Sequence, residues 1–379
     1  MILISSIFLI TLIGLIIWKF WFLERKISKI QLMPHQSIDV NLDIIKGWVL
    51  NLYQKKKFNG IIAFVKDDVV IFKYAAGYKS YKQEPIQENT KLRLASLSKS
   101  FTGFGVMLLS KNYDVSYDDP VSKYIKQFPI QDISIRQLLH HSSGIEVDYI
   151  LLAKKYKPKT PNYILSIKDA SILISKYVKH KYDGAGKKFN YNNSNYILLA
   201  RIIEIVSGLS FEYYMKQEVF NSLKLNNTRV WNLLSEYTKE ENDLFSEGFK
   251  SYFKSKKIKV QPKWTEGVAG DSGVFSTIND LIKWSNLWDL NPLLDNEEIQ
   301  EALTFPNLNS GVKFSHGFGW HLKENTIIQE GKKLATNAIM VKNFKNSTTL
   351  ILVDNSNNPR FKKIYNELTK NLDNLFNHK

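Results

Sequence analysis

A serine and a lysine three residues apart, Ser96 and Lys99, are the side chains of this chain with the clearest chemical potential. On a helix, residues three apart share one face, so the lysine nitrogen can lie against the serine hydroxyl. A hydroxyl with an adjacent base is the nucleophile of a covalent acyl-transfer mechanism. Further along the chain, Tyr191 could relay the proton and Asn193 could hold a substrate carbonyl. Together the four residues indicate a serine hydrolase that uses no catalytic histidine.

The spacing of serine and lysine alone is not specific. Ser96, Ser251 and Ser310 each have a lysine three residues on, and a serine at this place can be an ordinary helix N-cap. Only Ser96 leads into a largely apolar segment, residues 101–109, which predicts a buried helix behind it. Among the nineteen tyrosines, Tyr191 alone has an asparagine two residues on. The combination therefore favours Ser96 as the nucleophile.

The segments around these residues resemble one family over roughly residues 45–355. It is the group of class C β-lactamase-like serine hydrolases, which includes penicillin-binding proteins, D-aminopeptidases, D-Ala-D-Ala carboxypeptidases and esterases. The matching segments, in the order of the family, are residues 58–67, 93–102, 118–124, 135–145, 189–196 with 203–208, and 270–277 with 280–281. Such an ordered series is far more specific than either short motif.

The resemblance implies a fold and a set of roles. The fold would be α/β (α+β), of the serine β-lactamase/transpeptidase type, with an antiparallel sheet flanked by helices and an inserted, mainly helical subdomain. Ser96 would be acylated, while Lys99 and Tyr191 would transfer protons and Asn193 would bind the substrate carbonyl. Neither a metal nor another cofactor is expected, because this serine mechanism needs none.

The third motif of the family departs from its usual form. The chain contains neither His-x-Gly nor Lys-[Ser/Thr]-Gly, and the best placement is residues 329–331, Gln-Glu-Gly. Gly331 would keep the close backbone approach beside the oxyanion site and so contribute to substrate binding. Gln329 would replace the cationic or imidazole group that engages a substrate carboxylate, unless Lys332 or Lys333 substitutes after a shift in register.

Two functions of different classes remain open on this basis. The first is an active serine hydrolase, of the peptidase or esterase type, that acts on a small-molecule, peptide or ester substrate, possibly in the cell envelope. The second is a catalytically silent penicillin-binding-protein-like homologue that binds an envelope ligand or a protein partner. A true β-lactamase is favoured less, because it would be expected to keep the third motif.

The N-terminus predicts a membrane anchor. Residues 2–23 are mostly apolar, and their one charged residue, Lys19, can snorkel to the interface, while Trp18 and Trp21 suit an interfacial belt. No basic stretch precedes them and no small-x-small cleavage site follows, so we expect an uncleaved anchor. The predicted organisation is an anchor at 1–23, a juxtamembrane linker at 24–40 and a hydrolase domain at 41–379, with its helical subdomain at about 110–265.

Two features of the sequence give opposite predictions for the side of the membrane on which the main domain lies. Lys19, Arg25, Lys26 and Lys29 follow the apolar segment, which by the positive-inside rule would hold the domain in the cytoplasm. The family resemblance argues the reverse, because most relatives act on envelope substrates. We expect a single-pass protein with an extracytoplasmic domain.

Composition limits the partners. The chain has no cysteine, and therefore neither disulfides nor a thiol nucleophile, and its formal net charge is +16. This charge could serve anionic envelope polymers, or it could form an ordinary solvated basic face. None of the usual nucleic-acid-binding motifs accompanies it, so no nucleic acid is expected.

The remaining patterns predict the elements that must position the site. We expect a helix at 42–53, a hairpin at 60–72, a mainly helical stretch from 96 to about 266, a helix at 279–288, paired strands at 338–342 and 348–353, and a closing helix at 360–375.

His140 and His141 are interpreted as structural. Residues 270–273, Gly-Asp-Ser-Gly, resemble the nucleophile segment of chymotrypsin-like proteases, but we interpret them as a glycine-rich turn.

Overall fold

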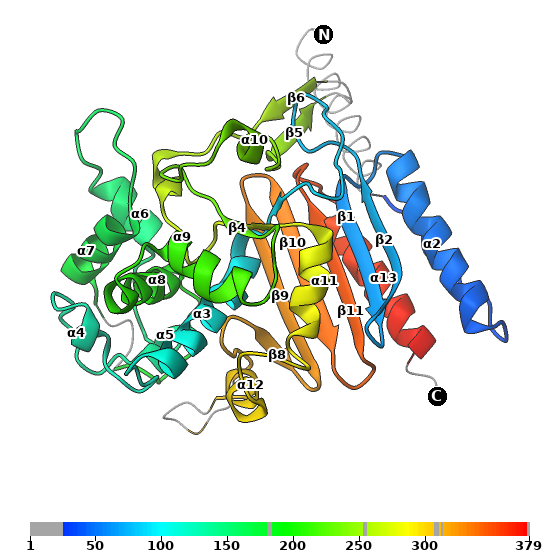
Figure 1. Ribbon diagram of the computed structural model, residues 1–379. Helices are drawn as coiled ribbons and strands as arrows, with labels where there is room; N and C mark the ends of the chain where they lie inside the picture. Colours follow the sequence, from blue (N-terminus) through cyan, green and yellow to red (C-terminus); the bar gives the residue numbers. More distant parts are fainter. Residues whose placement is uncertain (1–25, 180–183, 253–255, 307–310, 312–313, 377–379) are drawn as a thin grey trace, which may run out of the picture. The chain divides into compact units, whose positions relative to one another are not determined.

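The computed structural model describes residues 26–179, 184–252, 256–306, 311 and 314–376 (Figure 1). They form two compact units, one of residues 26–59 with 358–376 and one of residues 60–357. The predicted anchor at 1–23 lies outside the described residues. Within them no single helix has the length and apolar character to cross a bilayer, although the bent pair Asn193–Ser207 and Phe211–Asn221, at 79°, meets those two criteria together.

The smaller unit is built on two helices, α2 (Ile38–Gln54) and α13 (Phe361–Phe376), which contact each other. Helix α2 begins earlier than the predicted residue 42, because the Ser37 side chain accepts a hydrogen bond from the Val40 N–H and caps it. The Ile30 N–H donates to Glu367 Oε1 at 2.7 Å, which ties the segment before α2 to α13.

The larger unit contains a six-stranded antiparallel sheet with the order β2-β1-β11-β10-β9-β8. Its strands are β1 (Gly60–Lys66), β2 (Val69–Ala76), β8 (His321–Lys323), β9 (Thr326–Lys333), β10 (Thr336–Asn343) and β11 (Thr348–Asp354). The predicted hairpin and paired strands are confirmed, with Asp67 and Asp68 at the hairpin turn in the left-handed region. Because β1 pairs with β11, the two ends of the larger unit meet in the sheet and hold the long intervening region between them.

The intervening region is mainly helical. Its α-helices are α3 (Ser98–Asn112), α4 (Val121–Tyr124), α5 (Ile135–Leu139), α6 (Tyr149–Lys155), α7 (Ile167–Tyr177), α8 (Asn193–Ser207), α9 (Phe211–Tyr214), α10 (Lys239–Asn242), α11 (Ile278–Asn286) and α12 (Asn296–Leu303). Figure 1 shows most of these helices gathered to one side of the sheet, whereas α11 lies on the sheet and contacts β1 and β11.

Short strands interrupt the helical region and were not predicted. They are β3 (Leu92–Arg93), β4 (Arg229–Val230) and β7 (Val274–Ser276), which form a three-stranded sheet, and the hairpin of β5 (Phe249–Tyr252) and β6 (Lys256–Lys259). These strands are two to four residues long and β6 is mostly lysine, so they show little of the alternation by which a strand is recognised in a sequence.

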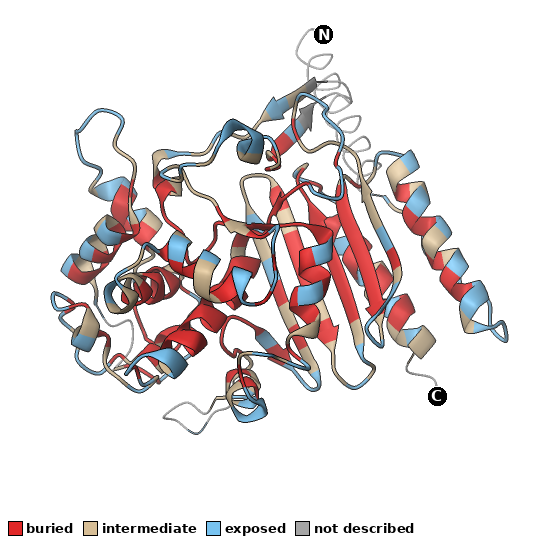
Figure 2. Ribbon diagram, in the orientation of Figure 1, coloured by how far each residue is buried: buried red, intermediate tan, exposed pale blue. Residues whose placement is uncertain are grey.

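Helix α3 forms the centre of the core, as its apolar sequence predicts. It is buried from Ser98 to Leu109, and Figure 2 shows that much of α8 and of the inner strands is buried as well. Phe101 stacks on Trp284 of α11 at 4.0 Å between ring centroids. A Cβ at Gly103 would lie 2.6 Å from the Phe318 carbonyl oxygen, so only glycine allows this close approach. The helix that carries Lys99 is therefore fixed from several sides.

Candidate active site

Ser96 lies in a short 3-10 turn, Ala95–Leu97, that leads into α3, and not within an α-helix as the spacing had suggested. Lys99, in the first turn of α3, still faces Ser96, with its Nζ 3.3 Å from the serine Oγ. Ala95 is buried with φ 50°, a left-handed conformation that costs an alanine about 1–2 kcal/mol. Strain of this kind, next to a reactive side chain, is held in place by the surrounding packing.

Lys99 is completely buried, and its nitrogen lies among three oxygens. Nζ is 3.3 Å from Ser96 Oγ, 2.9 Å from Asn193 Oδ1 and 2.8 Å from the Asp271 backbone oxygen. Asn193 and Asp271 are distant from Lys99 in the sequence, so the folding of the chain fixes the directions of the hydrogen bonds made by Lys99 Nζ. The structure therefore brings Ser96, Lys99 and Asn193 together.

Asn193 is the first residue of α8, whose N-cap is the side chain of Asn192. Its amide nitrogen donates to Asp148 Oδ2 at 2.9 Å, and its amide oxygen faces Lys99. The other carboxylate oxygen of Asp148 accepts from the Ile150 N–H and caps α6. A carboxylate that is itself fixed by a helix end thus sets the orientation of the Asn193 amide.

Tyr191 lies over Lys99, with 5.0 Å between Lys99 Nζ and the ring centroid. The ring packs against that of His141 at 4.4 Å and is 45% exposed. Its hydroxyl makes no hydrogen bond to any residue that the structure describes. The structure thus places the tyrosine beside the lysine, with its hydroxyl available to another group and not joined to Ser96.

Two buried histidines, His141 and His316, have their rings beside that of Tyr191, and a third, His140, contacts His316. Burial lowers the pKa of His140 to about 4 and that of His316 to about 3, and it holds the pKa of His141 well below 6.5. The Nδ1 atom of His141 accepts from the Asn192 N–H at 3.3 Å and is 3.0 Å from Asn195 Nδ2. At neutral pH the three rings are therefore uncharged, and His141 packs the loop that carries Tyr191.

The predicted third motif is on β9, directly opposite Ser96. A Cβ at Gly331 would lie only 2.4 Å from the Ser96 backbone nitrogen, so glycine allows strand and turn to meet. Gln329 is buried, and its Nε2 donates to the Ser96 carbonyl oxygen at 2.9 Å. The glutamine therefore braces the backbone of the nucleophile, which is not the role of the cation that it replaces.

Neither neighbouring lysine takes the place of Gln329. Lys332 is exposed, whereas Lys333 Nζ is 2.8 Å from Ser272 Oγ and 3.0 Å from Glu266. Ser272 belongs to the turn at residues 270–273, which sequence reasoning interpreted as structural and whose Asp271 oxygen contacts Lys99. The turn thus contacts Lys99 through the Asp271 backbone oxygen and Lys333 through the Ser272 side chain. The Ser272 hydroxyl donates to the Asp271 carboxylate, which fits a structural role for this turn.

Comparison with known families identifies the group to which these residues belong. The family model described as Beta-lactamase matches residues 46–370. The chain belongs to the beta-lactamase family.

Two relatives and one solved structure are similar to this protein over most of the chain. Penicillin-binding protein 4* of Bacillus subtilis is 27% identical, over 80% of this chain and 69% of its own length. Teichoic acid D-alanine hydrolase of Staphylococcus aureus is 26% identical, over 84% of this chain and 76% of its own. The crystal structure of FmtA from Staphylococcus aureus superposes with a TM-score of 0.70 at 21% identity, covering 91% of this chain and 92% of that one. This likeness shows the shared fold and confirms the resemblance stated from the sequence.

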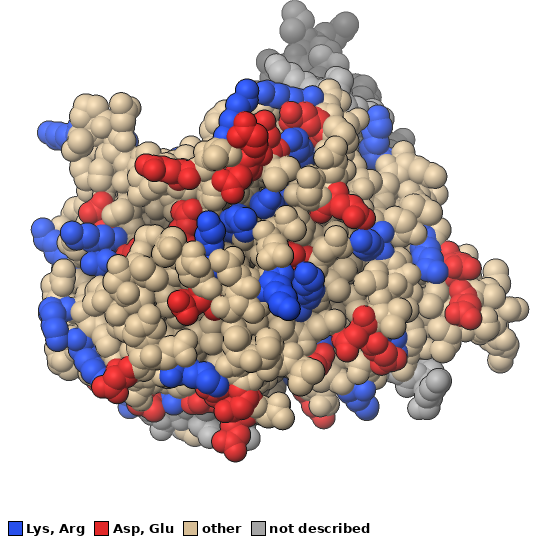
Figure 3. Space-filling model, viewed as in Figure 1, with Lys and Arg blue, Asp and Glu red and all other residues tan. Residues whose placement is uncertain are grey.

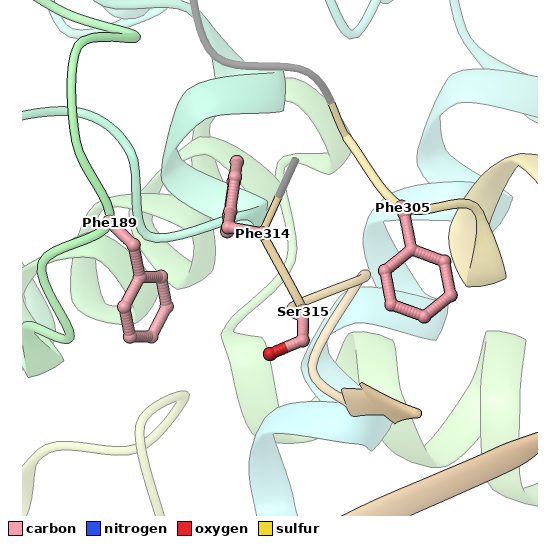
Figure 4. A pocket seen from close by; sticks show the side chains of 4 residues that line it. All are labelled: Phe189, Phe305, Phe314 and Ser315. Atoms are coloured by element: carbon pink, nitrogen blue, oxygen red, sulfur yellow. The ribbon is translucent and has the colours of Figure 1, made fainter. Parts of the chain in front are cut away.

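An aromatic pocket of about 490 Å³ adjoins the site on the side of Tyr191. It is lined by Phe189, Phe305, Phe314 and Ser315, and Figure 4 shows the rings of Phe189 and Phe305 on either side of the serine. Phe189 is two residues before Tyr191, and its ring is 6.2 Å from that of His141. In a chain of the beta-lactamase family, this pocket offers apolar surface near the proposed proton-relay tyrosine.

Sequence reasoning missed the residues that support the site. Asp148, Asp271 and Glu266 contact Asn193, Lys99 and Lys333, respectively. Asp148 precedes the Asn193 that it orients by 45 positions and lies in no recognisable motif. Asp271 contributes its backbone oxygen, for which side-chain chemistry gives no signal. Only the glycine-rich character of residues 270–273 pointed toward a special turn there.

Proposed function

We propose that this chain is a serine hydrolase that forms an acyl-enzyme on Ser96 from an ester or amide, with D-alanyl esters as the preferred class. The observation that carries the proposal is the position of Lys99, buried with its nitrogen 3.3 Å from Ser96 Oγ. A relative that is by name a teichoic acid D-alanine hydrolase supports the choice of acyl group. The catalytically silent alternative is not favoured, because the groups for acylation are together.

The surroundings of Lys99 suit a general base. In its amine form a lysine has two N–H groups and one lone pair. The oxygens of Asn193 and Asp271 are acceptors at 2.9 and 2.8 Å, and they take one N–H each. The lone pair is then directed at the Ser96 hydroxyl, whose O–H can donate to it. A serine is activated in this way by an adjacent base.

Acylation then proceeds by addition and elimination. Ser96 Oγ bonds to the carbonyl carbon while its proton passes to Lys99 Nζ. The resulting oxyanion is held by the Ser96 backbone N–H and by an N–H of β9 near Gly331, which the close approach of the two segments brings together. The bond from the carbonyl carbon to the leaving group breaks, and that group departs as an alcohol or amine after taking the proton from Lys99 through the Tyr191 hydroxyl.

Deacylation reverses the same proton path. A water molecule bonds to the acyl carbon and gives up its proton through Tyr191 and Lys99. The bond to Ser96 Oγ breaks, and the serine takes the proton back, which releases the acid and restores the starting state. Tyr191 suits both steps, because it is 45% exposed and its hydroxyl, which bonds to no described residue, can contact either the leaving group or the water.

The braced Gln329 bears on the substrate. Because its amide donates to the Ser96 carbonyl, no cation at this position faces a free substrate carboxylate. This favours an ester or amide of a D-amino acid over a peptide that ends in D-Ala-D-Ala. We place the enzyme at the membrane with an extracytoplasmic domain, where the net charge of +16 would favour anionic envelope polymers as partners.

The test compares the full-length chain on D-alanyl and L-alanyl esters of one alcohol, with kcat/KM as the readout. We expect the D-ester to be hydrolysed faster, and Lys99→Met to lower the rate by about 10²–10⁴-fold, the usual contribution of a general base. The control is Lys111→Met, the same change on the same helix at a partly exposed lysine paired with Glu298, which should leave the rate unchanged. No turnover of either ester by folded protein would reject the proposal.

A further inference from the structure

A second pocket, of about 420 Å³, lies in the larger unit away from Ser96. It is lined by residues from the loop after β2, the segment between β4 and β5, the end of β6, and β3 and β7. Four basic side chains, Lys79, Lys82, Arg93 and Lys259, line it together with the acidic Glu84, Asp243 and Glu247. The pocket is therefore polar, and basic by one charge.

Arg93 is the unusual member of this lining. It is 6% exposed, and its guanidinium carbon lies 4.5 Å from the Phe275 ring centroid and 5.4 Å from that of Trp231. Within the described part of the chain, the guanidinium makes no hydrogen bond and no ion pair. Five N–H donors on a buried cation are thus held between two rings without an acceptor, an arrangement that is costly unless an anion supplies one.

Glu266, the acidic residue that attracts Arg93, does not accept a hydrogen bond from its guanidinium. Glu266 attracts the guanidinium, but its carboxylate is paired with Lys333 at 3.0 Å. Burial lowers the pKa of Arg93 to about 10, so the group remains a cation at neutral pH. The charge of Arg93 is therefore not neutralised by a direct contact.

Ser246 offers a second donor in the same pocket. Its oxygen accepts from the Arg93 backbone N–H at 3.4 Å, and its hydroxyl hydrogen is given to no other described residue. Among the acidic residues of the lining, Glu247 is paired with Lys259, and Glu84 accepts from Ser80. Arg93 and Ser246 are thus two donors of the lining without an acceptor among the described residues, and both suit one planar or tetrahedral oxyanion.

We propose that this pocket binds a carboxylate or phosphate group, with the Arg93 guanidinium and the Ser246 hydroxyl as its donors. The attraction is local, because the face seen in Figure 3 carries basic side chains intermixed with acidic ones and no broad basic surface. Arg93 is three residues before Ser96, so a bound anion would lie near the catalytic turn without contacting it. The anion is either part of a larger substrate or a separate small ligand.

The test is binding of inorganic phosphate and of succinate to the full-length chain, by calorimetry and by thermal shift against chloride at equal ionic strength. We expect saturable binding of at least one probe. Arg93→Gln should weaken it by about tenfold or more, which corresponds to 1.4 kcal/mol. Arg201→Gln is the matched control, an arginine paired with Glu204 on α8, and should bind as the wild type does.

Ser246→Asp keeps the test decisive if Arg93→Gln fails to fold. The new carboxylate would pair with the guanidinium from within the chain, so the protein should fold and lose the binding of both probes. Competition of phosphate with an ester substrate would assign the site to the substrate, and binding without competition would assign it to a separate ligand. Absence of saturable binding, or equal binding by Ser246→Asp and wild type, would overturn the proposal. The binding measurements by calorimetry and thermal shift do not depend on turnover by Ser96.

Discussion

Asn193 presents its amide oxygen, and not its amide nitrogen, to Lys99. The distance from Asn193 Oδ1 to Lys99 Nζ is 2.9 Å, and the orientation is set by Asp148, which accepts from the amide nitrogen at 2.9 Å. An amide oxygen takes up an N–H of the lysine, whereas an amide nitrogen would compete with it as a donor. The state of the base proposed here thus depends on a carboxylate that does not itself touch Ser96.

Exchange of this carboxylate for an amide tests the dependence. In Asp148→Asn, one side-chain atom can still cap α6 while the other becomes a donor that faces the Asn193 amide nitrogen. We expect the Asn193 side-chain amide to rotate by about 180°, so that its nitrogen faces Lys99. We expect kcat to fall by about 10- to 100-fold, because an unsatisfied buried hydrogen-bonding group costs about 1–3 kcal/mol. Stability should change little, since asparagine is as good an N-cap as aspartate.

The control for this exchange is Asp295→Asn, the same change at the N-cap of α12. It should leave kcat and the free energy of unfolding as they are. Equal kcat values for Asp148→Asn and Asp295→Asn would show that the orientation of the Asn193 amide does not matter.

Gly331→Ala should separate β9 from the nucleophile. The new methyl group would lie 2.4 Å from the Ser96 nitrogen and 2.7 Å from the Leu94 oxygen. Both are backbone atoms, so the clash can be relieved only by a shift of the backbone of residues 94–96 or of β9. We expect a loss of about 1–3 kcal/mol in the free energy of unfolding, as for other overpacked sites, together with loss of most ester hydrolysis. Urea unfolding and steady-state rates measure the two effects.

Gly208→Ala separates clash from backbone strain. Gly208 has φ 71°, and a Cβ there would meet nothing within 4 Å. It should cost about 1–2 kcal/mol through its left-handed conformation and leave the rate constant intact. If Gly331→Ala behaved in the same way, the close approach of β9 would have no part in catalysis.

Gln329→Glu should weaken the turn that carries Ser96. The change replaces the amide that donates to the Ser96 carbonyl oxygen at 2.9 Å by a carboxylate oxygen. Two acceptors would then face each other in a buried place, and we expect a loss of about 1–3 kcal/mol in the free energy of unfolding and a lower kcat. Gln300→Glu, at an exposed position of α12, should stay within about 0.5 kcal/mol. Equal unfolding free energies for the two variants would refute a bracing role for Gln329.

The buried histidines predict lower stability in mild acid. The unfolded rings bind protons below about pH 6.5, whereas burial keeps the pKa of His140 at about 4 and that of His316 at about 3. The unfolded state therefore binds more protons as the pH falls from 7 to 5, and the free energy of unfolding decreases. We expect a loss of roughly 2 kcal/mol for each ring over this interval, from the 1.36 kcal/mol that one pKa unit represents.

Urea unfolding at the two pH values measures this loss. His316→Gln should have a smaller difference in unfolding free energy between pH 7 and pH 5 than the wild type, because one proton-binding group is removed from the unfolded chain. Stability that is equal at both values would mean that the folded protein takes up protons between pH 7 and pH 5 as readily as the unfolded chain does, which would contradict the lowered pKa values.

The sequence was informative where chemistry and packing coincide. The apolar run after Ser96 predicted the buried α3, and the strand-like segments at both ends of the larger unit predicted elements of one antiparallel sheet. Even without a recognisable third motif, the placement of residues 329–331 matched the strand that meets Ser96. Glycine was the signal there, because only the absence of a side chain allows this contact.

What the sequence did not reveal depends on the distant contacts of the folded chain. Asp148 reaches Asn193 because the N-terminal ends of α6 and α8 meet, and the Asp271 oxygen reaches Lys99 through a turn far along the chain. The hydrogen bond from Gln329 to the Ser96 carbonyl oxygen was also missed. The sequence indicated only that a glutamine replaces the cation of the family motif, and gave no sign of the new hydrogen bond. Such roles follow from geometry, which spacing alone does not encode.

The most direct test is covalent labelling of the full-length chain by a fluorophosphonate, with the adduct located by mass spectrometry. The account predicts a single adduct on Ser96 in the wild type, no adduct in Ser96→Ala, and much slower labelling in Lys99→Met. The half-buried Ser315, in the aromatic pocket, should stay unlabelled in all three proteins. Folded wild-type protein that remains unlabelled at Ser96, or labels equally fast without Lys99, would contradict an activated serine at this site.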